Sequence, residues 1–274
     1  LFPQMNFHIV VLGTGSATPR LGRHCSAQVV NMNGLKALVD CGEGTQNQIR
    51  AFHQKMQAFG HIFISHLHGD HIFGLPGLLA SMHLGGRTEP VTIYSVPGLK
   101  EAIMPLLEHS DTRLDYELNF VEISFEGNES KEIFSDRHGR VLAFPLYHKV
   151  PCMGFRFEEN PYAPNHRAIS YAYCCDTIYS EEIIPHIQGV DLLCVESTYD
   201  DACAPLAALR YHCTSRQAAT LADKANAKYL MLTHFSARYH DVSALLAQSR
   251  EVFPNTFEAT DGLHIDVDQL VKQP

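Results

Sequence analysis

Short apolar runs rich in β-branched and aromatic residues recur along the chain, and each is followed by a polar residue that can take part in chemistry. Runs of this length and composition predict strands. Residues just beyond strand ends lie on loops held by a rigid scaffold, where binding side chains concentrate. The runs and the polar residues after them are 36–39 with Asp40, 61–64 with Ser65 and His66, 141–144 with His148, 170–173 with Asp176, 191–195 with Glu196, and 229–232 with His234.

Between these runs, apolar residues recur at the spacing of one helical face. Leu75, Leu78, Leu79 and Met82 follow the i, i+3, i+4, i+7 pattern, which predicts a helix whose stripe faces the core rather than a cofactor. Thr214 and Gln217 resemble a capping box that opens another helix. Alternating strands and helices predict a layered α/β fold. The helix opened by the capping box is predicted at 214–225, and further helices are predicted at 49–59, 99–107 and 242–252. Apart from the helix at 99–107, the stretch 91–167 is rich in strands.

Length and composition narrow the possibilities. The 274 residues, 45% of them apolar, can form one large domain or two small ones, and we expect a single domain over residues 1–274. No apolar run approaches the roughly 20 residues that cross a bilayer, and the first residues lack the pattern of a signal peptide. We therefore expect a cytoplasmic protein without a membrane partner, with Met5 as the native start and residues 1–4 as a foreign extension.

The net charge of −9, from 21 basic and 30 acidic residues, argues mildly against a large RNA interface. Bound divalent cations would change this balance locally. None of the eight cysteines forms a C-x-x-C pair, and most lie in apolar runs, so we expect reduced core residues rather than disulfides. The alternative is that Cys174 or Cys213 tunes a neighbouring site.

The strongest chemical signal is the segment from Ser65 to His71, which holds three histidines and an aspartate within six positions. Burying them without partners would cost roughly 1–3 kcal/mol for each group. Metal ions supply shared partners, since histidine and aspartate are ordinary zinc ligands. The alternative, a solvated histidine-rich loop, is weakened because further ligand types follow the predicted strands downstream.

These residues predict two metal sites. His66, His68 and His148 suit one ion, while Asp70, His71 and His234 suit a second. Asp176 can bridge both, because a carboxylate has two oxygens. We expect two zinc ions in each chain, with manganese or another divalent metal as the alternative. Such a pair activates water and neutralises a phosphodiester during its hydrolysis. Asp40 is expected to hydrogen-bond and orient the histidine loop.

The segment His66-x-His68-x-Asp70-His71 resembles the signature of the metallo-β-lactamase superfamily, and the motifs around it resemble those of ribonuclease Z, the tRNA 3′-endonuclease family. The resemblance implies a four-layer αββα sandwich with the metals at one edge between the sheets. It also implies an endonuclease that removes the 3′ trailer from precursor tRNA, commonly as a homodimer. The motifs lie at 12–19, 39–46, 66–71, 148–151, 173–177 and 232–239.

The same resemblance implies catalytic roles. Glu196 and His212 correspond to the pair that protonates the leaving oxygen, and Asp70 to the base that takes a proton from water. A carboxylate beside a histidine fixes its tautomer and raises its pKa, which suits an acid. The neighbouring residues Val195 and Cys213 depart from the family pattern but leave the reacting groups unchanged. The alternative is a purely structural Glu–His pair.

Two departures concern RNA. The family inserts a long, lysine-rich arm that grips tRNA before the Asp176 motif, whereas only residues 152–172 intervene here. Either the arm is shortened or missing, or a stretch near residues 164–167 is absent from this sequence. A loop that inspects the tRNA 3′ end has Arg23-His24 where the family has Arg-Asn. These departures and the acidic charge keep open a related phosphodiesterase or sulfatase acting on a small substrate. A non-catalytic metal-binding or RNA-binding module is the third class, although such a module would be expected to lose ligands.

Overall fold

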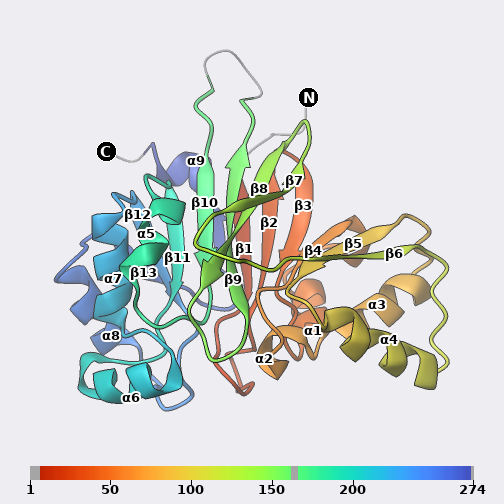
Figure 1. Ribbon diagram of the computed structural model, residues 1–274, viewed down its shortest axis with the longest axis horizontal. Coiled ribbons are helices and arrows are strands. Elements are labelled where there is room, and N and C mark those ends of the chain that lie inside the picture. Colours follow the sequence, from red (N-terminus) through yellow and green to blue (C-terminus); the bar gives the residue numbers. More distant parts are fainter. Residues whose placement is uncertain (1–6, 162–165, 273–274) are drawn as a thin grey trace.

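Two seven-stranded mixed sheets face each other in the computed structural model, which describes residues 7–161 and 166–272 (Figure 1). The expected start at Met5 lies outside the described residues. In spatial order the first sheet holds β14 (His264–Asp266), β1 (His8–Gly13), β2 (Ala27–Met32), β3 (Leu35–Val39), β4 (His61–Phe63), β5 (Val91–Ser95) and β6 (Leu118–Glu122). The second holds β13 (Thr256–Glu258), β12 (Tyr229–Thr233), β11 (Leu192–Glu196), β10 (Ser170–Cys174), β9 (Cys152–Glu159), β8 (Gly139–Leu146) and β7 (Lys131–Ser135).

Helices cover the outer faces of both sheets (Figure 1). Those of the first half are α1 (Thr45–Ala51), α2 (Gly69–Ile72), α3 (Leu75–Leu84) and α4 (Leu99–His109). Those of the second half are α5 (Ile184–Ile187), α6 (Ala204–Arg210), α7 (Ser215–Lys224), α8 (Ser243–Arg250) and α9 (Val267–Leu270). Single 3₁₀ turns lie at Met56–Ala58, Glu181–Ile183 and Asp201–Cys203. This arrangement confirms the expected four-layer αββα sandwich.

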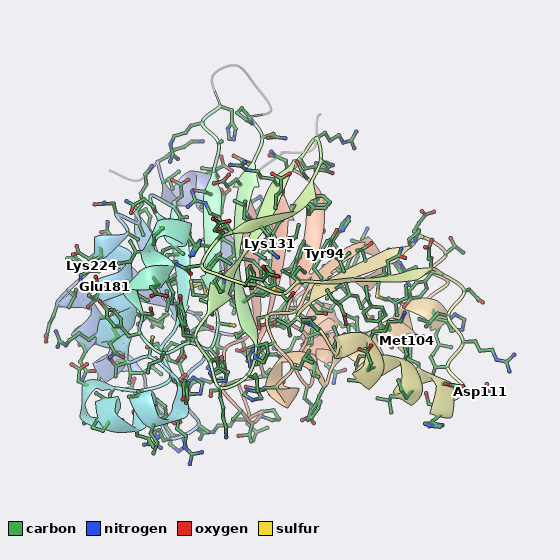
Figure 2. The ribbon with its side chains drawn as sticks, in the orientation of Figure 1. Tyr94, Met104, Asp111, Lys131, Glu181 and Lys224 are labelled. Atoms are coloured by element: carbon green, nitrogen blue, oxygen red, sulfur yellow. The ribbon has the colours of Figure 1, made fainter. Side chains whose placement is uncertain are left out.

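The main core lies between the sheets. Phe63 of β4 meets Phe155 and Phe157 of β9 across the interface, with ring centroids 5.5 and 5.4 Å apart. Tyr94 of β5, labelled in Figure 2, stacks on Phe63 at 4.7 Å. A second apolar cluster joins the outer face of the first sheet to α1, α3 and α4. Aromatic packing of this kind fixes the sheets rigidly, so loops at their edges can be held in place.

Parallel pairing places the predicted polar residues at one edge. Strands β10, β11 and β12 run parallel, as do β3, β4 and β5. The carboxyl ends of parallel strands meet at the same edge of a sheet, so the residues after them converge. Asp40, Asp176, Glu196 and His234 each end or follow one of these strands. The polar residues that follow the predicted strands in the sequence thus lie together along one edge of the sheets.

Most predicted helices are confirmed, and one is corrected. The capping box of α7 is present, with Gln217 N–H donating to Thr214 and Thr214 N–H donating to Gln217. The helix expected over 49–59 is wrong in its bounds, because α1 starts at Thr45 and ends at Ala51. His53 adopts a left-handed φ of 56°, which interrupts the helix before the 3₁₀ turn at Met56.

All eight cysteines are free thiols, as expected, and all but Cys203 are buried. The thiol beside the predicted metal site is not that of Cys174. Cys175 lies there instead, with its Sγ 3.9 Å from His66 Nδ1 and 3.3 Å from Cys152 Sγ. Within the described part of the chain, no helix has the length and apolarity needed to span a bilayer.

Candidate metal centre

The structure brings together all seven residues predicted as metal ligands, at the edge where α2 lies (Figure 1). His66 and His68 follow β4, and Asp70 and His71 lie in the short helix α2. The other three come from the connection after β8, from the residues after β10 and from the end of β12: His148, Asp176 and His234. Four segments of the chain therefore share one site.

The first group of ligand atoms comes from three histidines and one carboxylate. The Nδ1 atom of His68 lies 3.1 Å from His66 Nε2 and 3.2 Å from His148 Nε2. Asp176 Oδ2 lies 3.7 Å from the Nε2 atoms of both His66 and His148. These ligand atoms all lie within 4.8 Å of one another. Three imidazoles and a carboxylate oxygen form a tetrahedral ligand set that zinc accepts.

The second group lies on the other side of Asp176. His234 Nε2 is 3.4 Å from Asp70 Oδ2, and His71 Nε2 is 3.6 Å from the same oxygen. Asp176 Oδ1 is 3.0 Å from His234 Nε2 and 3.5 Å from His71 Nε2. The two oxygens of Asp176 therefore face different groups, which is the geometry of a bridging carboxylate.

Two buried atoms lack a well-aligned hydrogen bond and are placed to contact a bound cation. Among the described residues, neither His71 Nε2 nor Asp176 Oδ1 has a hydrogen-bond partner. Both residues are almost completely buried. Leaving such groups unpaired costs about 1–3 kcal/mol each. A metal ion between them would satisfy both, so this ligand set fits divalent cations.

Burial and charge set the protonation of the ligands. Burial lowers the pKa of His66 well below its usual range, and it also lowers those of His68 and His148. Burial opposes a charge on His71 too, but the carboxylates of Asp40, Asp70 and Asp176 outweigh it and raise its pKa well above normal. Neutral imidazoles are the form that binds metal. A cation in the second group would displace the proton of His71.

Each of four histidines is oriented through its other ring nitrogen. His66 Nδ1 lies 3.1 Å from the Ser65 hydroxyl, and His71 Nδ1 lies 2.7 Å from Asp40 Oδ2. Two further partners carry no sequence signature of their own: the Tyr211 carbonyl, 2.9 Å from His148 Nδ1, and the Thr198 hydroxyl, 3.0 Å from His234 Nδ1. Such contacts fix the ring orientation of a metal ligand.

Asp40 orients the histidine loop, as expected. It accepts hydrogen bonds from the Ser65 backbone N–H at 2.8 Å and from the hydroxyls of Ser65 and Tyr173 at 3.0 and 2.8 Å. Its φ of 56° lies in the left-handed region, which aspartate tolerates better than most residues. The side chain is fully buried, and its hydrogen bonds hold the loop in place.

The predicted Glu196–His212 pair is present beside the ligand groups. His212 Nδ1 lies 2.8 Å from Glu196 Oε1, and the backbone N–H of Thr177 donates to the same oxygen at 2.9 Å. Thr198 donates both its N–H and its hydroxyl to Glu196 Oε2. Burial opposes protonation of His212, but the charge of Glu196 outweighs it and raises the pKa to about 9. In the metal-free protein this favours the protonated imidazole at neutral pH.

Thr198 and Ala17 are site residues that the sequence reasoning missed. The Thr198 hydroxyl contacts Glu196 and His234, so it links the acid pair to a metal ligand. Its place two residues after Glu196, within the motif that ends β11, is the signal that could have identified it. The backbone N–H of Ala17 donates to Asp70 Oδ2 at 2.7 Å, and no side chain marks this role.

A cavity of about 970 Å³ opens onto the ligand groups and the acid pair. Its rim carries the exposed side chains of Phe73, Leu209 and Tyr211, which are 70%, 72% and 44% exposed. Basic residues on the same walls are Lys149, Arg210 and Arg238, and the acidic ones are Glu43, Asp70 and Asp176. The cavity thus combines aromatic and cationic groups although the chain as a whole is acidic.

The Arg23-His24 loop is held by its own side chains. Arg23 donates to the Tyr239 carbonyl at 3.0 Å and lies over the Phe235 ring. The backbone and the ring of His24 both contact Asp261 Oδ2, at 2.7 and 2.9 Å. These two side chains therefore fix the loop against neighbouring segments of the site.

Comparison with known proteins agrees with this geometry. The beta-lactamase superfamily domain matches residues 36–235. Ribonuclease Z of Azobacteroides pseudotrichonymphae is 42% identical, covering 95% of this chain and 99% of the relative, and that of Bacteroides thetaiotaomicron is 38% identical, covering 95% of each. The crystal structure of the short form of human tRNase Z aligns with a TM-score of 0.79 at 34% identity, covering 95% of this chain and 99% of that one.

The two alignments with the bacterial relatives run over 287 and 303 positions, more than the 274 residues of this chain. The relatives therefore carry residues without a counterpart here. Identity above 30% over nearly the full length of both proteins establishes the family. The chain belongs to the ribonuclease Z family of metal-dependent hydrolases, within the metallo-β-lactamase superfamily.

Proposed function

We propose that this protein is the endonuclease that removes the 3′ trailer from precursor tRNA, acting with two zinc ions. The observation that carries the proposal is the bridging position of Asp176, with one oxygen toward each ligand group. His66, His68 and His148 would hold one ion, and Asp70, His71 and His234 the other. Two bound cations would lower the pKa of a water molecule and offset the charge of the phosphodiester.

Residues in and beside the ligand groups would supply the base and the acid of the reaction. Histidine partners keep Asp70 ionised, so its carboxylate can orient a water molecule and accept a proton. The Ala17 N–H fixes that carboxylate in place. His212 lines the cavity, and Nε2 is the ring nitrogen that can donate to a leaving oxygen, because Nδ1 contacts Glu196. The proposed base thus belongs to the second ligand group, and the proposed acid lies close to Asp176 and His234.

The rim of the cavity favours RNA over a small ester. Aromatic rings stack on unpaired bases, and basic side chains contact phosphates, which is how proteins hold single-stranded nucleic acid. Phe73 and Tyr211 supply the rings, and Lys149, Arg210 and Arg238 supply the charges. We infer that the nucleotides flanking the cleaved bond lie across this rim.

The zinc-loaded enzyme is expected to cut a 3′-extended precursor tRNA at the start of its trailer and to hydrolyse bis(p-nitrophenyl) phosphate slowly. Gel analysis of the RNA and absorbance of p-nitrophenolate measure the two reactions, with mature tRNA and chelator-treated enzyme as controls. Hydrolysis of the ester with no cleavage of RNA would favour a small-substrate phosphodiesterase. Failure on both substrates would overturn the proposal.

Removing the ring of Tyr211 is expected to weaken RNA binding. Tyr211 has a φ of 59° and its carbonyl contacts His148, so asparagine, which tolerates this conformation, is the suitable replacement. Stacking of a base on a ring contributes about 1–3 kcal/mol, so Tyr211→Asn should raise KM for precursor tRNA roughly 5–150-fold with little change in kcat. Tyr211→Phe, which keeps the ring, is the control. Unchanged KM in Tyr211→Asn would rule out stacking.

We also propose a cytoplasmic homodimer in which residues 1–274 form one domain. The free thiols of all eight cysteines suit a reducing compartment. Leu84 at the end of α3 and Met104 and Leu106 on α4 are exposed apolar side chains of the kind that an interface between two copies would cover. Met104 of α4 is labelled in Figure 2. A shared core between the sheets supports a single domain.

A further inference from the structure

A second cluster of ligand-type side chains lies at the opposite end of the sheets from α2, where β9 ends and α9 begins (Figure 1). Glu159 is the last residue of β9, His166 lies in the connection to β10, and Asp268 belongs to α9. The catalytic proposal uses none of them. This connection is also the segment in which the chain is shorter than the family it resembles.

The three side chains converge. His166 Nε2 contacts Glu159 Oε1, and His166 Nδ1 lies 3.9 Å from Asp268 Oδ1. One ligand atom from each residue lies within 4.8 Å of the others. Glu159 and Asp268 are only 3% and 4% exposed. Two carboxylates and an imidazole from three separate segments thus share one buried point.

Backbone N–H groups donate hydrogen bonds to one oxygen of each carboxylate. Glu159 Oε1 accepts the Ile169 N–H at 2.8 Å, and Asp268 Oδ2 accepts the Phe7 N–H at 2.8 Å. Glu159 Oε2 is buried and has no hydrogen-bond partner among the described residues. Burial raises the pKa of Glu159 and the nearby charge of Asp268 adds to the rise, although the contacts with His166 and the Ile169 N–H lower it. A buried carboxylate in this position needs a proton or a cation.

We propose that Glu159, His166 and Asp268 form an additional zinc site that stabilises this end of the fold. One imidazole and two carboxylate oxygens form a ligand set for zinc or a similar divalent transition metal. A cation there would satisfy Glu159 Oε2 and offset the repulsion between the carboxylates. It would join β9, the connection after it and α9, whose Asp268 side chain accepts the Phe7 N–H. The site would be structural, because it lies at the other end of the sheets from the acid pair.

The test compares metal content between variants of the full chain. After chelation, zinc loading and removal of excess zinc, wild-type protein should hold one zinc ion per chain more than His166→Ala or Glu159→Gln, measured by plasma mass spectrometry. His138→Ala is the matched control, because the His138 side chain is similarly buried and lies near the same end. Its ring contacts the Asn33 carbonyl and the adjacent Asp136 and Arg137 rather than the proposed ligands. Glu159→Gln keeps the size of the side chain and an oxygen for the Ile169 N–H, so it should fold even if His166→Ala does not.

Zinc should also raise the melting temperature of an Asp176→Ala protein, and adding Glu159→Gln should remove that rise. Hydrolysis of bis(p-nitrophenyl) phosphate by Glu159→Gln should match wild type. Equal zinc content in wild type, His166→Ala and Glu159→Gln would overturn the proposal and leave a Glu–His ion pair only. The test compares the number of zinc ions bound by wild type and variants. Its outcome therefore does not depend on whether the proposed RNA cleavage is observed.

Discussion

Replacing Asp176 by alanine is expected to abolish hydrolysis of precursor tRNA and of bis(p-nitrophenyl) phosphate alike. The side chain places one oxygen against His66 and His148 and the other against His71 and His234, so its loss removes a ligand from both groups. Both proposed ions would bind more weakly. Since the proposed ions would activate water and neutralise the phosphodiester, neither substrate should react.

The fold should survive this change. Core burial dominates the stability of a domain of this size, and Asp176 lies at the edge of the sheets rather than between them. Circular dichroism should match wild type, while zinc content measured by mass spectrometry should fall. Asp115→Ala is a suitable control, because that aspartate is 75% exposed. Near wild-type turnover in Asp176→Ala, on either substrate, would show that the bridging role is wrong.

Much of this centre could be predicted because its signals are local. The spacing of His66, His68, Asp70 and His71 lies within one loop, and His148, Asp176 and His234 each follow a strand that the apolar pattern identifies. Parallel pairing through β11 then brings the ends of β10 and β12 to one edge. The end of β8 reaches the same edge because β8 and β10 both pair antiparallel with β9. Asp40 could be assigned for the same reason, since it ends the strand beside the histidine loop.

The remainder depends on contacts that sequence patterns do not encode. The Tyr211 carbonyl and the Ala17 N–H are backbone groups, so residue type does not reveal that they orient His148 and Asp70. The end of α1 depends on a left-handed residue, His53, which the apolar stripe did not show. The order of strands across the sheets is likewise set by pairing between distant segments, such as β1 with β14.

Loss of the acid pair should have the second largest effect, and it should depend on the substrate. Replacing Glu196 or His212 by alanine is expected to slow RNA cleavage roughly 10²–10⁴-fold, the usual contribution of general acid–base catalysis. His212 contacts Glu196 through Nδ1, and Glu196 is fixed by Thr177 and Thr198. Because the two residues act as one unit, the double variant should lose little more than either single variant.

The pH profile gives an independent measure of the same role. An acid must be protonated to donate, so RNA cleavage should be retained below the pKa of His212 and lost as the pH rises through it. The charge of Glu196 raises that pKa to about 9 in the metal-free protein, and bound cations would lower it. Glu196→Gln keeps the side-chain size but removes the charge, so its alkaline loss of activity should begin at lower pH than in wild type at the same zinc loading.

Comparison of leaving groups separates an acid from a structural pair. p-Nitrophenolate departs with little protonation, whereas the alkoxide of RNA is a poor leaving group that needs a proton. Glu196→Ala and His212→Ala should therefore hydrolyse bis(p-nitrophenyl) phosphate almost normally and keep their zinc, since neither residue belongs to the proposed ligand set. Thr198 contacts both Glu196 and the ligand His234, so metal content must be measured for each variant. If both substrates slowed equally and zinc were lost, the pair would be positioning the metal ligands, and the proton would have to come from another group.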